Sequence, residues 1–174
     1  YWGSVELLKK IVFPFDLKSI KDKKIMDVGI GSGRISNNLL KYDPSKLVAV
    51  EPSEAINIAK ENIKSDKIEF FNIKGQDINF KDEFDYVFAL CVLHHIPQYK
   101  EVLKKIEKSL KSGGKFVAWV YSKEGMETYI FLLKNLRRIT SIMPDSMLRL
   151  FSKFLAALTY PYGFICNFLP LSLI

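Results

Sequence analysis

Short apolar runs alternate with amphipathic segments along the first 121 residues. Five runs rich in Val, Ile, Leu and Phe predict strands at 25–28, 47–50, 68–73, 84–90 and 116–121. Between several of them, apolar residues recur at helical spacing and predict helices at 32–41, 52–64 and 97–110. Apolar strands separated by helices are typical of a parallel sheet that is covered on both faces. We therefore expect an α/β fold with a doubly wound, Rossmann-like, mostly parallel sheet.

The pattern changes after Tyr121. Helices are expected at about 123–138 and 145–158, and no charged residue occurs from 154 to 174. That stretch is long enough to span a bilayer, but Pro161, Gly163, Asn167 and Pro170 interrupt it. We expect two parts, a sheet domain at 1–121 and a helical cap or lid at 122–174. A segment lying on a membrane surface is the second interpretation, and a transmembrane helix is the third.

Composition narrows the class of protein. Of 174 residues, 48% are hydrophobic and 26% are charged, which excludes a disordered or fibrous chain. Two cysteines and two adjacent histidines exclude a disulfide scaffold and a zinc ribbon, and we expect no metal site. The formal charge of +7 raises the question of a nucleic-acid or anionic-membrane partner, but the basic residues are spread along the chain. We expect a cytoplasmic protein, and the second interpretation of the C-terminal part adds a peripheral membrane contact through 154–174.

A glycine-rich turn between the first strand and the following helix is the strongest signal. Residues 27–33 read Asp-Val-Gly-Ile-Gly-Ser-Gly, which places glycines at 29, 31 and 33. Glycine allows a tight turn and brings the backbone close to a ligand, while the helix start offers free N–H groups. Glycines also serve purely structural strand-to-helix turns. The G-x-G-x-G spacing differs from the G-x-G-x-x-G of dinucleotide-binding proteins.

An acidic residue, Glu51, ends the second strand eighteen positions after Gly33. In nucleotide-binding Rossmann sheets a carboxylate at this place binds the ribose hydroxyls. A solvated strand-end carboxylate is the alternative, but the glycine loop favours the ribose.

At these residues the chain resembles the class I S-adenosylmethionine-dependent methyltransferases. The resemblance covers about 20–121 and rests on five segments in family order, namely 27–33, 50–53, 84–90, 92–97 and 110–115. It implies S-adenosylmethionine or S-adenosylhomocysteine as cofactor. It assigns cofactor contacts to the glycine loop, with Gly29, Ile30, Gly31 and Gly33, to Glu51 and to Pro52. Asp27 would fix the loop and the ammonium end of the cofactor.

The adenine contact is less clear from the resemblance. The family often has Gly-Asp-Ala after the third strand, whereas this chain has Lys74-Gly-Gln76-Asp77. Gln76 or Asp77 is expected to receive the adenine amino group, and a turn or helix-capping role for Asp77 is equally open.

The end of the fourth strand contributes Leu90 and Cys91, expected beside the cofactor because α/β sheets bind ligands at the carboxyl ends of their strands. His94 and His95 follow, and either is a candidate general base for a hydroxyl or amine acceptor. The structural alternative is a capping or packed imidazole. Cys91 is interpreted as a small buried hydrophobe rather than a nucleophile. Methyl transfer needs alignment and exclusion of water more than covalent catalysis, so no triad is expected.

The C-terminal third is the only clue to the methyl acceptor. Its Met, Phe and Tyr residues suggest an apolar wall, and its Arg and Lys residues supply positive charge. We expect a small apolar or amphipathic acceptor and no nucleic acid, since the Asn-Pro-Pro-aromatic motif of base flipping is absent. The family's final antiparallel strands are expected to be absent from this chain. The alternative functions are a cofactor-binding module without catalysis and a nicotinamide-dependent dehydrogenase.

Overall fold

The computed structural model describes residues 4–122 and 124–168. The chain divides into two compact units, Tyr1–Tyr121 and Ser122–Ile174, and each is described by itself.

The first unit holds five strands and four α-helices among its described residues. The strands are β1 (Lys24–Val28), β2 (Lys46–Val50), β3 (Ile68–Phe71), β4 (Phe84–Leu90) and β5 (Leu110–Trp119). The helices are α1 (Val5–Val12), α2 (Arg34–Leu40), α3 (Ala55–Asn62) and α4 (Tyr99–Ser109). Short 3₁₀ turns, η1 (Leu17–Ile20), η2 (Gly75–Asp77) and η3 (Leu93–His95), complete it.

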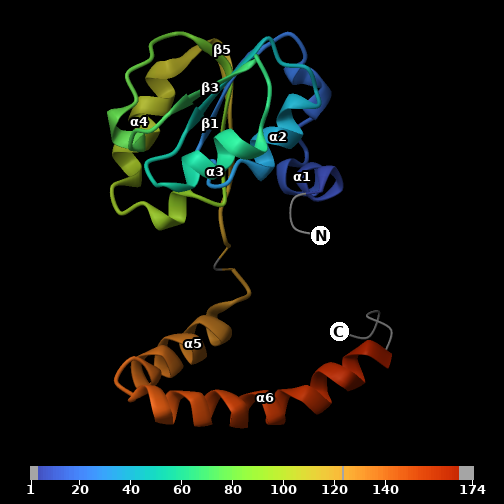
Figure 1. Ribbon diagram of the computed structural model, residues 1–174, viewed down its shortest axis with the longest axis vertical. Helices are drawn as coiled ribbons and strands as arrows, with labels where there is room; N and C mark the ends of the chain where they lie inside the picture. Colours follow the sequence, from blue (N-terminus) through green and yellow to red (C-terminus); the bar gives the residue numbers. More distant parts are fainter. Residues whose placement is uncertain (1–3, 123, 169–174) are drawn as a thin grey trace. The chain divides into compact units, whose positions relative to one another are not determined.

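The strands form one parallel sheet in the order β3-β2-β1-β4-β5. After β3 the chain crosses to the other side of β1, so the strand order reverses between β1 and β4. Helix α4 covers one face of the sheet, and α1 and α2 cover the other (Figure 1). This arrangement confirms the predicted doubly wound fold. It also places the ends of β1, β2 and β4 at the switch point where such sheets bind ligands.

The core consists of two layers that the strands separate by simple alternation. Ile25 and Phe88 pack with α1 and α2, whereas Met26 and Val87 pack with α4. Neighbouring positions in a strand point to opposite faces, so each buried strand serves both layers. This explains why the strands read as continuous apolar runs.

Within the first unit, the start of β5 differs most from the predicted bounds. A strand is predicted from 116 to 121, but β5 already begins at Leu110. Phe84 pairs with Leu110 and Tyr86 with Lys115, so the ladder is irregular between them. Gly113 has φ +79° inside this bulge. Gly113 and Gly114 therefore lie in a bulge within the strand.

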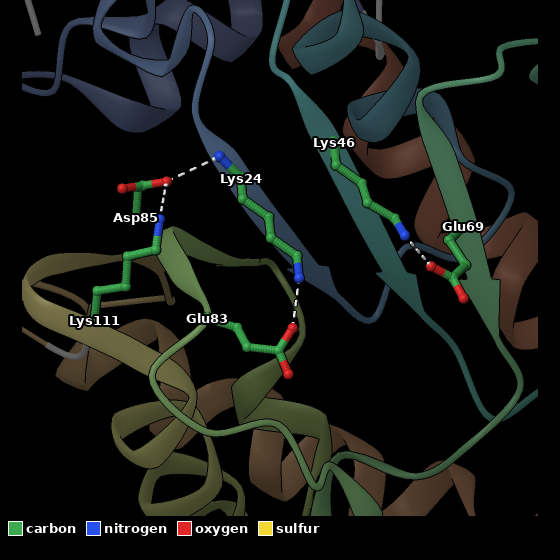
Figure 2. Close-up of polar contacts among 6 residues, drawn as sticks. All are labelled: Lys24, Lys46, Glu69, Glu83, Asp85 and Lys111. Atoms are coloured by element: carbon green, nitrogen blue, oxygen red, sulfur yellow. Dashed lines mark hydrogen bonds and ion pairs between the residues drawn. The ribbon is translucent and has the colours of Figure 1, made fainter.

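Charged side chains join the strands at their amino-terminal ends (Figure 2). The backbone N–H of Lys24 and the Nζ of Lys111 both donate to Oδ2 of Asp85, each at 2.9 Å. Burial raises the pKa of Asp85, but these hydrogen bonds and the charges of Lys111 and Lys23 outweigh it and hold the pKa below its usual value. The Nζ of Lys24 pairs with Glu83. These contacts align β1, β4 and β5 at the end of the sheet opposite the glycine loop.

Helix α1 was not predicted, although its sequence carries the signal. Ser4 accepts a hydrogen bond from the N–H of Leu7 and caps the helix. Leu8 and Val12 are buried one turn apart against the sheet.

The second unit consists of α5 (Glu127–Thr140) and α6 (Asp145–Phe168) in its described part. Helix α6 was expected to end near residue 158 but continues through Pro161 (Figure 1). Proline removes one backbone hydrogen bond and bends a helix without necessarily ending it. The described helices include none that is long and apolar enough to cross a membrane. Lys123 and the segment 169–174, with Pro170, lie outside the described residues, and a cap over the strand ends stays a prediction.

Candidate cofactor and methyl-transfer site

The glycine loop joins β1 to α2 and needs glycine at three positions. Gly29, Gly31 and Gly33 have φ values of +76°, +54° and +83°. Residues with a Cβ adopt this region only at a cost. Gly29 donates its N–H to the carbonyl of Val50, which ties the loop to the end of β2.

The three glycines differ in what surrounds them. A Cβ on Gly29 would lie 2.2 Å from Cγ2 of Val92, and one on Gly33 would lie 2.7 Å from Cδ1 of Ile63. These two glycines therefore allow close packing of the loop against the rest of the domain. A Cβ on Gly31 would meet nothing within 4 Å. Gly31 therefore faces open space, and only its positive φ favours glycine there.

Glu51 lies where β2 ends and is 8% exposed. Its Oε2 accepts the N–H of Gly31 at 2.9 Å. Its Oε1 accepts both the N–H of Ser53 at 3.0 Å and the hydroxyl of Ser53 at 2.6 Å. Asn72 donates to the backbone carbonyl of Glu51 at 2.9 Å. The carboxylate is therefore held in one position. Because each oxygen has two lone pairs and Oε2 accepts only one of the three hydrogen bonds to the carboxylate, Oε2 can still accept one more.

Asp27 lies at the carboxyl end of β1, beneath the loop, and is 2% exposed. The hydroxyl of Ser36 on α2 donates to its Oδ2 at 2.6 Å. Burial raises the pKa of Asp27 from 3.8 to about 6, although the hydrogen bond from Ser36 lowers it. Asp27 thus connects the strand to the helix on either side of the glycine loop.

Two hollows meet at Gly29. One encloses about 280 Å³ and lies beside Glu51. Its walls are Val28, Gly29, Val50, Glu51, Pro52, Lys74, Gly75, Gln76, Val92, Ile96, Pro97 and Gln98. The other encloses about 240 Å³ and lies between α1 and the glycine loop. Its walls are Ser4, Leu7, Leu8, Ile11, Gly29, Ile30, Gly31, Ser32, Arg34, Ile35, Asn38, Leu90 and Cys91. We call them the Glu51 hollow and the α1 hollow.

Most of the sequence-predicted residues lie in these walls. Ile30, Leu90 and Cys91 line the α1 hollow, and Pro52 and Gln76 line the Glu51 hollow. The amide of Gln76 also donates to Gln98 at 3.3 Å across that hollow.

Asp77 lies outside the hollows, and Cys91 has an unusual backbone conformation. Asp77 is exposed and is not among the residues that line the Glu51 hollow. Cys91 is half-buried with φ +63°, and burial raises the pKa of its thiol. A raised thiol pKa disfavours the thiolate, in agreement with a packing role.

The two histidines lie on η3 and are exposed, outside the walls of both hollows. Their ring centroids are 4.1 Å apart, and the ring of His94 also contacts that of Tyr121 at 4.7 Å. Burial lowers the pKa of His94 below 6.5, and the neighbouring His95 lowers it further. The lowered pKa favours the neutral imidazole, which can accept a proton.

Sequence reasoning missed the wall that α1 builds and the anchoring role of Ser53. The helical spacing of apolar residues after Ser4 would have revealed the helix, but its position against the glycine loop depends on packing. Ser53 was interpreted only as part of a helix start. Its contact with Glu51 is local and follows from the spacing of the two residues.

Comparison with known proteins identifies the family. A family model described as a methyltransferase domain matches residues 26–118, more than half of the chain. The tRNA U34 carboxymethyltransferase of Helicobacter acinonychis is 33% identical over 106 residues, covering 57% of this chain and 40% of that protein. The ubiquinone biosynthesis O-methyltransferase of Coxiella burnetii is 31% identical over 129 residues, covering 66% and 54%. The chain thus spans about half the length of these relatives or less.

Solved structures share the fold. An S-adenosylmethionine-dependent methyltransferase from Mesorhizobium loti superposes with a TM-score of 0.57 at 19% identity, covering 67% of this chain and 52% of that one. The YcgJ protein from Bacillus subtilis gives a TM-score of 0.60 at 17% identity, with coverages of 79% and 58%.

The relatives correct one prediction. We expected no nucleic-acid partner, and that expectation is wrong, because several similar proteins are tRNA U34 carboxymethyltransferases. The absent motif excludes only those enzymes that use it, and charge spread along the sequence does not exclude RNA.

The glycine loop, the acid that ends β2 and the order of the sheet agree with the family match. The chain therefore belongs to the class I S-adenosylmethionine-dependent methyltransferases, whose cofactor is S-adenosylmethionine.

Proposed function

We propose that this chain transfers a methyl group from S-adenosylmethionine to an apolar or amphipathic compound that carries a hydroxyl. The observation that carries the proposal is the position of Gly29 in the walls of two hollows of different character. A two-part site suits a reaction in which a donor and an acceptor must meet at one point.

The residues of the Glu51 hollow suit the adenosine part of the cofactor. Glu51 is held by Gly31 and Ser53, and its Oε2 would accept a ribose hydroxyl. Gln76 would receive the adenine amino group, because it lines this hollow whereas Asp77 is exposed and does not. Gly31 lines the α1 hollow next to Gly29, where the two hollows meet, and would lie against the methionine part there. When bound, the cofactor supplies a methyl group that is already activated on a sulfonium.

The α1 hollow suits the acceptor. Leu7, Leu8, Ile11 and Ile35 give it an apolar surface, which excludes water, and Arg34 adds a positive charge. The O-methyltransferase relatives favour a hydroxyl as the methylated group. This chain's own contribution is then to orient the acceptor and to keep the site dry. A transfer-RNA acceptor is the second candidate, and the tRNA-modifying relatives favour it.

Turnover with the two acceptor classes tests the proposal. The chain is incubated with S-adenosylmethionine and either a panel of alkyl-substituted phenols or unmodified tRNA, and release of S-adenosylhomocysteine is measured. We expect release with a phenol, lost when Ile11→Asp places a charge in the α1 hollow. Ile11 is half-buried and borders the core, so circular dichroism confirms that this variant folds. Release of S-adenosylhomocysteine with tRNA but with no phenol would show that the acceptor is RNA and would contradict the proposed hydroxyl compound.

Binding without turnover would support the alternative of a cofactor-binding module. Calorimetry with S-adenosylhomocysteine separates the cases, because it reports the cofactor site independently of any acceptor. Binding of NAD in preference to S-adenosylhomocysteine would instead contradict the whole assignment of the site.

A further inference from the structure

The second unit presents apolar surface that its own helices do not bury. No residue of α5 is buried. Tyr129, Leu132, Leu133 and Ile139 are 54%, 60%, 42% and 51% exposed, although their spacing puts them on one side of the helix. An amphipathic helix of a folded domain normally buries such a stripe.

Helix α6 continues this surface. Met147, Leu150, Phe154 and Leu158 follow one another at intervals of three or four residues, so they share a side of the helix. Their exposed fractions are 55%, 71%, 61% and 64%. We call the exposed apolar residues of α5 and α6 the apolar face. Patches of this kind on a protein surface mark sites of interaction with a partner.

Positive charge accompanies the apolar face. The two helices carry Lys134, Arg137, Arg138, Arg149 and Lys153. The acids on the helices are Glu127 and Asp145, each the first residue of its helix, where the helix dipole favours a negative charge. From residue 154 to the end of α6 no charged residue occurs. Basic residues therefore lie opposite or beside an apolar stripe on the same helices.

We propose that α5 and α6 dock on an anionic lipid surface and lie in the plane of the interface. Helices that combine an apolar stripe with Lys and Arg bind such surfaces, through apolar burial and attraction to the lipid headgroups. Among the described helices none can cross a membrane, so docking on the surface is the form that fits. A nucleic acid would use the basic residues but would leave Leu150 and Phe154 in water, which makes lipid the better partner.

A flotation assay of the whole chain with lipid vesicles tests this proposal. Vesicles of phosphatidylcholine, with and without phosphatidylglycerol, serve as probes. We expect the chain to float with the anionic vesicles and much less with the neutral ones. Leu150→Asp should weaken binding by about tenfold or more, because it puts a charge on the apolar face. Replacing Arg149 and Lys153 with Gln should weaken it about fivefold per charge.

Matched measurements keep the test decisive. Ala156→Gln changes the side of α6 that carries Arg149 and Lys153, and it should leave flotation unchanged. All variants should keep their affinity for S-adenosylhomocysteine, so failure here is distinguishable from failure of the proposed function. Flotation that is absent, or that Leu150→Asp leaves unchanged, overturns the proposal. So does a chain that binds tRNA or a second copy of itself but no vesicles.

Discussion

Gly31 donates its backbone N–H to Oε2 of Glu51 at 2.9 Å, although the two residues are twenty positions apart. The contact joins the glycine loop after β1 to the end of β2. It keeps an acid and an open backbone position together before any ligand arrives, so little ordering remains to be done on binding.

Replacing Glu51 with Ala should weaken binding of S-adenosylhomocysteine by about 1–3 kcal/mol, because a charge-assisted hydrogen bond to the ribose is lost. Titration calorimetry measures the change. Glu54→Ala is the matched control, because Glu54 is an exposed acid three positions away. Equal affinities in the two variants would remove Glu51 from the site.

Gly31→Ala and Gly33→Ala should separate binding from stability. The first places a Cβ in open space at φ +54° and should cost the fold only about 1–2 kcal/mol while sharply reducing cofactor affinity. The second adds contacts at 2.7 Å to Ile63 and 3.1 Å to Ala59 and should destabilise the fold by a further 1–3 kcal/mol or so. Urea unfolding and calorimetry on both variants measure this. If Gly31→Ala unfolds the chain and binds no worse per folded molecule, Gly31 is structural.

Asp27 and Asp85 should change stability with pH in opposite directions. In the folded chain the pKa of Asp27 is about 6 against 3.8 unfolded, so folding takes up a proton between these values. Its contribution therefore opposes folding above pH 6 and lessens as pH falls, by up to about 3 kcal/mol. The pKa of Asp85 is lowered, so its contribution is present above its ordinary pKa and is lost as pH falls through the folded value.

Urea unfolding from pH 3 to 8 or so tests both signs. Asp27→Asn should make the chain more stable at neutral pH and remove its part of the pH dependence, whereas Asp85→Asn should make it less stable there. The same sign in both variants would contradict the assigned shifts.

His94→Asn and His95→Asn should each keep most of the activity and all of the cofactor affinity, because both rings lie outside the two hollows. Initial rates between pH 5 and 8 or so decide the matter. The contrary result is a loss of about 10²–10⁴ in rate in one variant, together with a wild-type rate that falls as pH drops through the lowered pKa of His94. That residue would then be a general base.

The sequence by itself determined the class of fold and pointed to the candidate site. Buried parallel strands must be apolar on both faces, so β4 was predicted at its observed bounds. The glycines and Glu51 were recognisable because a tight turn and a ribose each demand particular residue types at short spacing. Features of this kind depend on residues that are close together in the sequence, so they can be recognised without the structure.

Only the tertiary structure decided what depends on long-range packing. It showed that a side chain at Gly29 would clash with Val92 and one at Gly33 with Ile63, whereas Gly31 faces open space. It brought α1 against the glycine loop, and it set Gln76 rather than Asp77 in the wall of the Glu51 hollow. These outcomes follow from side chains that meet across the sheet switch point, and no periodicity within a single segment carries that information.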